Sequence, residues 1–298
     1  MKLKKVLLFG GIGNQLFQLS RAYQHKLDGK NVALINIQIG KSIIYNFLNL
    51  TQHNDWIDMC KLSSEVGIEC KRISLKDAFF IIYVFFQKRL SKKSNFNTQY
   101  DYNSYLPIDI GYFQSRKHVS LEAINKVAEL LLDYLSIKNK NPINDFTIHI
   151  RGSNFDAAKR EHIQFTSPQD VQRAIKFSKK NNISIKIVTN SKKDAIKVFP
   201  SASEDNFSNG KNELEDFKIL CLSKNLFLSN STFSFWAYLC AKKLYLSEVN
   251  SIPGFTEISM FPKLLEHDGI KYSSVINELI KYSIYRYKKE KKLSKSLS

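Results

Sequence analysis

Residues 5–18 read KVLLFGGIGNQLFQ, and this stretch decides the fold. It begins with Val6-Leu7-Leu8-Phe9, a continuous apolar run of the kind that forms a strand buried on both faces. The glycines of Gly10-Gly11-Ile12-Gly13 end the run, and residues 14–27 then have the pattern of a helix. A second strand is predicted at residues 32–37. This order of strand, glycine turn, helix and strand is typical of the start of a parallel α/β sheet.

A second series of strands and helices begins near Asn141. Residues 146–151 read as a strand, and Ser167-Pro168 supplies an N-cap and a first-turn proline for a helix that runs to about residue 180. The further elements that we expect are a strand at 183–188, a helix at 213–223, a strand at 226–228, a helix at 231–241 and a strand at 244–246. The sequence therefore predicts an α/β protein of two Rossmann-like domains, residues 1–140 and 141–280, followed by a basic tail at 281–298.

The composition is that of a globular protein with an acidic partner. The chain has 298 residues, of which 43% are hydrophobic and 24% charged, and its formal net charge is +18. Residues 281–298 carry a net +6, so the rest of the chain still carries +12. Such a charge favours a nucleic acid, an anionic membrane or a phosphorylated substrate. The basic residues are spread along both halves and no nucleic-acid-binding module is recognisable, so we expect no nucleic acid partner.

The cysteines and apolar runs indicate a cytoplasmic protein. The chain has four cysteines and no CxxC pair, which predicts free thiols in a reducing compartment: Cys60, Cys70, Cys221 and Cys240. Residues 1–10 resemble a first strand more than a signal peptide. The apolar run at 78–86 is too short to span a bilayer. Because lysines and an arginine follow it, two interpretations stay open: contact with an anionic membrane surface, or a buried helix with a solvated end.

Three stretches carry candidate binding chemistry. The glycine turn brings backbone close to a ligand and places a helix N-terminus behind it. It lacks the glycine of a dinucleotide fingerprint, because position 16 is Leu16, and the second strand ends without an acidic residue. Gly40-Lys41-Ser42 lacks the leading glycine of a phosphate loop, since position 35 is Ile35. The turn is therefore either an anion site of another kind or a tight turn only.

The other two stretches follow predicted strands. His149 and Arg151 are two apart, so both side chains project from one face at the strand's C-terminal end, where α/β sheets bind ligands. Arginine there can grip a diphosphate, and the alternative is a core histidine beside a salt-bridged arginine. Residues 229–236 read SNSTFSFW, and their hydroxyls either cap a helix or hold a phosphate at its N-terminus. Phe233, Phe235 and Trp236 are expected in the core.

Together these stretches resemble the glycosyltransferases of family 11, the α-1,2-fucosyltransferases. Residues 10–18 match the family's opening GGxGNQxFQ, Gly111-Tyr112-Phe113-Gln114-Ser115 its GYxQS segment, His149-Ile150-Arg151 its HxRRGDY motif and residues 229–236 its ANSSFSWW block. The order and spacing agree from Lys5 to about Phe261.

The resemblance implies a GT-B-like fold, with two Rossmann-like domains facing a cleft, the acceptor mainly on the first and the nucleotide on the second. It implies that Arg151 holds the donor's diphosphate and that His149 and Asp216 place the guanosine. Ser234 would bind phosphate with Ser231 and Thr232 at the helix start, and Asn14 and Gln15 would lie near the transferred sugar. One departure affects the motif: Arg151 is followed by Gly152-Ser153-Asn154-Phe155 instead of Arg-Gly-Asp-Tyr. We take Arg151 as catalytic through the leaving group and Asp156 as the candidate base, with Glu161 and His162 as alternatives.

The expected enzyme is a galactoside α-1,2-fucosyltransferase-like hexosyltransferase. It would move L-fucose from GDP-fucose, with inversion, to a hydroxyl of a glycan acceptor, in bacterial lipopolysaccharide O-antigen synthesis. GDP-sugar would be a co-substrate, and no cofactor or metal is expected because the chain has no Asp-x-Asp motif. The acceptor would be lipid-linked, with the enzyme in the cytoplasm at the inner face of the plasma membrane. The alternatives are a related GDP-6-deoxyhexose such as colitose as donor, or a basic membrane-surface or nucleic-acid-binding protein.

Overall fold

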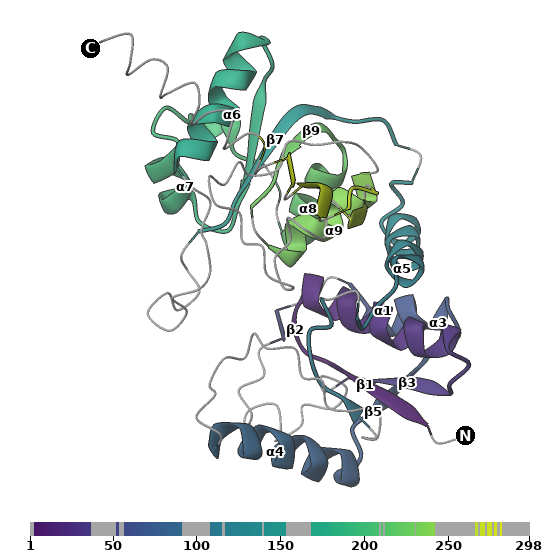
Figure 1. Ribbon diagram of the computed structural model, residues 1–298. Coiled ribbons are helices and arrows are strands. Elements are labelled where there is room, and N and C mark those ends of the chain that lie inside the picture. Colours follow the sequence, from purple (N-terminus) through teal and green to yellow (C-terminus); the bar gives the residue numbers. More distant parts are fainter. Residues whose placement is uncertain are drawn as a thin grey trace. The chain divides into compact units, whose positions relative to one another are not determined.

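A computed structural model of the chain (Figure 1) describes its helices, strands and most of their connections. The described residues are 3–36, 52–53, 57–90, 108–114, 117–138, 140–152, 168–208, 210, 212–229 and 231–241, with short pieces at 266–267, 269–271, 273–275, 277–278 and 281. By their contacts, Met1–Ser251 forms one compact unit and Ile252–Ser298 a second. The predicted domain limits near residues 140 and 280 stay predictions.

The first sheet is parallel and starts as the sequence predicts. Its strands are ordered β5-β3-β1-β6 and all pair in parallel, with bounds Lys4–Leu8 for β1, Val32–Asn36 for β3, Glu69–Arg72 for β5 and Ile108–Asp109 for β6. The helix after the glycine turn is α1, Ile12–Leu27. A two-stranded parallel ladder joins β2 (Gly10–Gly11) to β4 (Gln52–His53). The predicted strand–turn–helix–strand order is therefore confirmed.

Strand β1 is buried on both faces, as its apolar run indicates. Leu7 and Phe9 pack with Ile81 and Val84 of α4, Leu75–Leu90, on one face of the sheet. Alternate side chains of a strand point to opposite faces, so Val6 and Leu8 point to the other face, where α1 lies (Figure 1). Helix α4 includes the whole apolar run at 78–86, and Ile81 and Val84 on one side of the helix belong to the core.

Two further helices pack beside α1 and the first sheet, and neither was predicted from the sequence. Helix α3 spans Met59–Ser64, and α5 spans Leu121–Tyr134 and packs against α1. Ser120 caps α5, because its hydroxyl accepts a hydrogen bond from the Ala123 amide. The apolar residues of α5 recur at three- and four-residue spacing, which buries one side of the helix.

The second sheet is also parallel, with the order β8-β7-β9. Its strands and helices are β7 Asn144–Ile150, α6 Pro168–Lys180, β8 Ile185–Thr189, α7 Lys192–Val198, the 3₁₀ helix η2 Glu204–Asn206, α8 Glu213–Cys221, β9 Ser223–Phe227 and α9 Thr232–Ala241. The predicted strands and helices of this half are confirmed within a few residues, except that the strand at 244–246 lies outside the described residues. Two parallel sheets covered by helices confirm the α/β fold class. The two domains facing a cleft that a GT-B-like fold requires stay a prediction.

The central strand β7 is apolar on one face and polar on the other. Phe146, Ile148 and Ile150 share a core with Val171 and Ile175 of α6. Thr147 and His149 alternate with them and are buried on the opposite face, where Thr147 Oγ1 lies 2.5 Å from Ser223 Oγ. The polar face of β7 therefore meets Ser223 at the start of β9 and, through His149, Ser229 just after β9.

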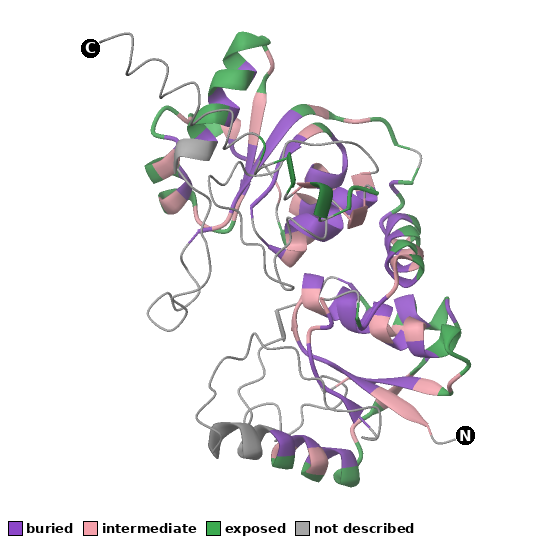
Figure 2. Cartoon of the chain, viewed as in Figure 1, coloured by how far each residue is buried: buried purple, intermediate pink, exposed green. Residues whose placement is uncertain are grey.

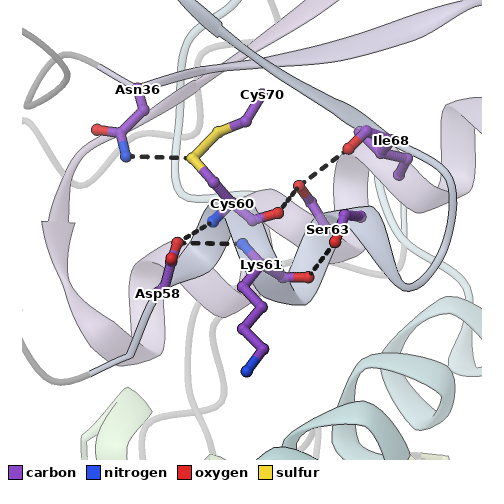
Figure 3. Close-up of a disulfide and its surroundings, with 8 residues drawn as sticks. Asn36, Asp58, Cys60, Lys61, Ser63, Ile68 and Cys70 are labelled. Atoms are coloured by element: carbon purple, nitrogen blue, oxygen red, sulfur yellow. Dashed lines mark hydrogen bonds between the residues drawn. A yellow bond between two sulfur atoms is a disulfide. The ribbon is translucent and has the colours of Figure 1, made fainter.

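The cysteines differ in part from the prediction of free thiols. Cys60 in α3 and Cys70 in β5 form a disulfide across ten residues of sequence, and Figure 3 shows the bond beside Asn36 at the end of β3. Asp58 accepts hydrogen bonds from the Cys60 and Lys61 amides and so caps α3. The two thiols meet because α3 folds back directly onto β5, which cysteine spacing does not reveal. Cys221 and Cys240 are free and buried, as expected.

Candidate functional site

His149 is the centre of a buried polar cluster at the C-terminal end of β7. Its Nδ1 lies 2.7 Å from the Ser229 hydroxyl and also contacts the Ser234 hydroxyl. Ser234 Oγ lies 3.1 Å from Ser231 Oγ and 3.2 Å from Ser229 Oγ. The Phe233 ring packs against the imidazole, with 5.5 Å between ring centroids. Two hydroxyls and one aromatic ring therefore fix the orientation of His149, as in a satisfied core histidine.

Arg151 immediately follows this strand and acts electrostatically on His149. Burial, followed by the positive charge of Arg151, lowers the pKa of His149 to about 3. The ring is therefore neutral at neutral pH. The Nδ1 atom of a neutral imidazole can accept a hydrogen bond from a serine hydroxyl. In that tautomer the ring proton is on Nε2. The structure thus brings His149 and Arg151 together at one strand end, as their spacing predicts.

The serine-rich stretch forms the start of α9. The Ser231 hydroxyl accepts a hydrogen bond from the Ser234 amide at 3.1 Å, so it caps the helix. Phe235 and Trp236 are buried in the core, as expected, whereas Phe233 is half-buried between His149 and Phe217. Capping by Ser231 satisfies only one of the N–H groups in the first turn of α9. The first N–H groups of any helix have no intrahelical acceptor and favour anions.

Asp216 lies in the first turn of α8, beside a close backbone approach. Its Oδ1 accepts a hydrogen bond from the Ser208 hydroxyl at 2.5 Å. A Cβ on Gly210 would come within 2.4 Å of the same oxygen, so only glycine leaves room for this carboxylate. Burial, opposed by the Ser208 hydrogen bond and supported by Glu213 and Glu215, raises the pKa of Asp216. The carboxylate is thus held in a fixed place and favours a partner that donates hydrogen bonds.

The glycine turn is fixed by side-chain amides. Gly10 has φ +81°, which L side chains rarely adopt, and its carbonyl accepts a hydrogen bond from Gln15 Nε2 at 2.8 Å. Gln18 is fully buried: its Oε1 accepts from the Phe9 amide at 2.9 Å, and its Nε2 donates to the Gly111 carbonyl at 3.0 Å. A tight turn is therefore a sufficient reason for Gly10, and binding by this loop stays a prediction.

The glycine turn also meets the segment that begins at Gly111. Gln114 Nε2 donates a hydrogen bond to Asn14 Oδ1 at 3.0 Å, and the rings of Phe9 and Tyr112 lie 5.1 Å apart. Two stretches about a hundred residues apart are thus locked together by Asn14, Gln18 and Gln114. The side-chain amide oxygen of Asn14 is therefore already engaged by Gln114.

The glycine turn further contacts the start of α9. The Trp236 indole donates a hydrogen bond to the Gly13 carbonyl at 2.9 Å. A Cβ on Gly13 would come within 2.6 Å of the Thr232 backbone carbon. Phe17 stacks on Phe235 and meets Trp236 edge-on. The three stretches that the sequence singles out therefore converge on one place, around Gly13, Thr232 and Ser234.

The departure at position 152 has a steric reason. A Cβ on Gly152 would lie 2.5 Å from Ser191 Cβ and 2.8 Å from Asp194 Oδ2, so the backbone passes tightly against the start of α7. The Gly152 amide donates to Asn190 Oδ1 at 2.8 Å. Asp156, Glu161 and His162 lie outside the described residues, so the base stays a prediction.

Sequence reasoning missed the residues that hold the candidate side chains in place. Gln18 was seen only as part of a motif, although a glutamine on the buried side of a helix needs backbone partners and so indicates a structural role. Ser208 and Gly210 lie in a short polar stretch with no periodic pattern, and nothing in the sequence marks them. Among the described residues, no three His, Cys, Asp or Glu side chains gather as metal ligands would.

The arrangement is suited to holding an anion. A guanidinium, several hydroxyls and a helix N-terminus lie at the C-terminal ends of neighbouring parallel strands. The neutral imidazole of His149 belongs to the same cluster. The Asp216 carboxylate is held by Ser208 and Gly210 at the start of α8, and its place near a donor nucleotide stays a prediction.

Comparison with solved structures gives only distant similarity. POFUT1 in complex with GDP matches with 10% identity and a TM-score of 0.37, covering 84% of this chain and 99% of that one. E. coli heptosyltransferase WaaC with ADP matches with 9% identity and a TM-score of 0.39, covering 87% of this chain and 89% of that one. Similarity at this level carries no conclusion about substrate.

The C-terminal part of the chain resembles a different protein, which sequence reasoning did not find. The family description "D-ala D-ala ligase C-terminus" matches residues 236–281. The D-alanine–D-alanine ligase of Borrelia duttonii is 56% identical over 48 residues, 16% of this chain and 13% of the ligase. That of Caldicellulosiruptor bescii is 50% identical over 54 residues, 18% of this chain and 15% of the ligase. The chain spans less than a fifth of these ligases, so we infer no activity from them.

The main part of the chain matches a single family. The profile "Glycosyl transferase family 11" covers residues 59–252, more than half of the chain, and includes the stretches at Gly111, His149 and Ser229. It ends at residue 252, where the second compact unit begins. The opening stretch at residues 10–18 lies before the match, so its resemblance stays a prediction. The chain belongs to glycosyl transferase family 11.

Proposed function

We propose that this glycosyltransferase moves L-fucose from GDP-fucose to a hydroxyl of a galactoside-containing glycan, forming an α-1,2 linkage with inversion. The acceptor is a lipid-linked precursor of a bacterial surface polysaccharide such as O-antigen, and transfer takes place in the cytoplasm at the inner face of the plasma membrane. No metal takes part.

The convergence of Arg151, His149 and the start of α9 is the observation that carries this proposal. A sugar diphosphate leaves as an anion, so its transferase must place positive potential where that charge develops. Arg151 supplies a guanidinium that can bind a diphosphate through parallel hydrogen bonds. The first N–H groups of α9 and the hydroxyls of Thr232 and Ser234 add donors next to it. Together these groups can do the work that a divalent cation does in other transferases.

Asp216 supports guanine as the base of the donor. Guanine presents two neighbouring N–H donors, which a carboxylate can accept in parallel. Ser208 and the bare backbone of Gly210 hold the Asp216 carboxylate in place. Uracil and adenine do not present that pair of donors to one carboxylate, so Asp216 would favour GDP over UDP or ADP.

The reaction is a single displacement. The acceptor hydroxyl attacks the anomeric carbon, its proton passes to a base, and GDP departs from the opposite face with the electron pair of the broken bond. The pKa of His149 is lowered to about 3 and its Nδ1 is hydrogen-bonded to a serine hydroxyl, so the ring is a weak base. We therefore assign His149 to positioning the donor. Asp156 remains our candidate for the base.

Calorimetry tests the donor first. GDP, GDP-fucose, GDP-colitose, GDP-mannose, UDP-glucose and NAD are titrated in a buffer that contains a chelator. We expect GDP and GDP-fucose to bind. Arg151→Ala should lower the affinity for GDP, and in a transfer assay it should lower turnover about a hundredfold or more. The matched control is Arg173→Ala, which removes an exposed arginine of α6. No guanine-nucleotide binding, a strict metal requirement, or unchanged turnover in Arg151→Ala would contradict the proposal.

Product analysis then tests the linkage and the sugar. The enzyme is incubated with GDP-fucose or GDP-colitose and a β-galactoside, and the linkage of the product is read by NMR. Transfer to the 2-hydroxyl from GDP-fucose supports the proposal, and preferential use of GDP-colitose would replace fucose with its relative. Transfer to another hydroxyl would remove the α-1,2 assignment.

A further inference from the structure

Helix α4 exposes large apolar side chains on the side that faces away from its sheet. Ile81 and Val84 are buried against β1 and β3, whereas Leu75 is 80%, Phe79 73% and Tyr83 58% exposed. These three residues recur every four positions, so they form one stripe along the helix. Figure 2 shows the exposed and buried residues alternating along the described part of α4. The outer stripe is thus an apolar surface that lies outside the described core.

Positive charge accompanies this stripe. Lys76 is exposed and lies within about 100° of the three apolar residues around the helix axis. Arg72 is exposed directly before the helix, and Lys71 lies next to it, paired with Glu69. The helix carries one acidic residue, Asp77, which is buried and bonded to Lys5. Its negative charge is therefore neutralised within the fold, and the outer surface keeps its basic character.

We propose that the outer stripe of α4, Leu75, Phe79 and Tyr83 with Lys76, docks on a bilayer that contains anionic phospholipid. Aromatic and leucine side chains enter the boundary between headgroups and acyl chains, while lysine remains at the phosphates. No helix among the described residues is long and apolar enough to cross a membrane. In the proposed contact α4 lies along the bilayer surface, as an amphipathic helix does. This inference does not depend on which sugar nucleotide the enzyme uses.

Charge complementarity selects a bilayer over a second copy of the chain. A two-fold contact through this stripe would bring together two copies of a protein whose net charge is already +18, with Arg72 and Lys76 of each copy beside the contact. An anionic leaflet attracts the same residues, by about 1 kcal/mol for each lysine or arginine near the surface. The same stripe is therefore repelled by its own copy and attracted by anionic lipid.

Vesicle sedimentation of the full chain tests this inference. Phosphatidylcholine vesicles are compared with vesicles that also contain about 30% phosphatidylglycerol, at about 0.1 M salt. We expect the protein to sediment with the anionic vesicles only. Phe79→Ser combined with Tyr83→Ser should lower the partition coefficient about tenfold or more, and Lys76→Glu about fivefold. The matched control is Ile143→Ser combined with Ile196→Ser, which removes two exposed apolar residues elsewhere and should change nothing.

Each other outcome overturns the inference. Equal binding to neutral vesicles removes the role of charge, and unchanged binding in the Phe79/Tyr83 variant assigns the membrane contact to another segment. A dimer that this variant dissociates, seen by sedimentation equilibrium, would make the stripe a protein interface. Nucleotide binding is measured on the same variants by calorimetry. Because the substituted side chains are exposed, nucleotide affinity should be unchanged, so loss of vesicle binding with retained nucleotide binding separates this inference from the proposed donor.

Discussion

Burial and the Arg151 guanidinium together keep His149 neutral. The first of these causes is the larger, and the serine hydroxyls at Nδ1 match a neutral ring that accepts there. A neutral histidine adds no second positive charge beside Arg151, the residue that we propose to bind the donor's diphosphate. At the scale of one residue, the serine cluster therefore serves to orient a ring that does not titrate near neutral pH.

The first prediction concerns the titration of His149. The ring should show no change in its ¹H or ¹⁵N NMR shifts between about pH 8 and pH 5, because its pKa in the folded chain is about 3. Between about pH 6.5 and pH 3 the unfolded chain binds a proton at this site and the folded chain does not, so stability falls as the pH drops through that window. Urea unfolding of His149→Gln should lack this part of the pH dependence. A midpoint near pH 6.5 for the His149 resonances would contradict the assignment.

The second prediction concerns the departure from the family motif at Gly152. Gly152→Arg restores the residue type expected after Arg151, yet its Cβ would overlap Ser191 and Asp194. Overpacking of this kind costs about 1–3 kcal/mol of folding free energy. We therefore expect Gly152→Arg and Gly152→Ala both to lower stability in urea unfolding. If Gly152→Arg instead bound GDP more tightly with unchanged stability, the backbone here would be looser than the structure shows.

At the scale of elements, α1 and α9 are joined through Gly13. The Trp236 indole bonds to the Gly13 carbonyl, and Thr232 packs where a side chain on Gly13 would lie. These helices come from opposite ends of the compact unit Met1–Ser251. The glycine turn therefore links the first sheet to the start of the serine-rich helix.

The third prediction uses two glycines of one turn as a matched pair. Gly13→Ser should lower the free energy of unfolding by about 1–3 kcal/mol, since its Cβ meets the Thr232 backbone. Gly11→Ser introduces the same atoms where nothing lies within 4 Å, and serine at this N-cap should leave stability unchanged or slightly higher. Urea unfolding followed by circular dichroism measures both. Equal losses would mean that α9 does not restrict position 13.

Much of the fold could be predicted because its signals are local. Continuous apolar runs predict β1 and β3, the alternating residues 146–150 predict β7, and Ser167-Pro168 predicts the start of α6. Helix α5 has a cap at Ser120 and regular apolar spacing, so its signal was present and went unused. The Cys60–Cys70 bond and the Gly210–Asp216 contact depend on which segments meet in space, and spacing along the chain does not encode that.

At the scale of the whole molecule, the chain combines two parts of different resemblance. The transferase match ends at residue 252, and the second compact unit is Ile252–Ser298. The match to the ligase C-terminus spans residues 236–281 and thus overlaps the last transferase helix, α9. The predicted donor-binding residues all belong to Met1–Ser251, so under this proposal the second unit contributes no side chain to the nucleotide site.

The fourth prediction follows from this division. A chain that stops at Ser251 should fold and bind GDP with an affinity within about threefold of the full chain, because it keeps Arg151, Asp216 and the start of α9. Calorimetry measures the affinity, and circular dichroism shows whether the shortened chain is folded. The ligase-like residues after 251 would then serve some need other than donor binding. A folded but non-binding chain would instead mean that residues after 251 complete the nucleotide site, and the ligase-like sequence would have become part of a transferase.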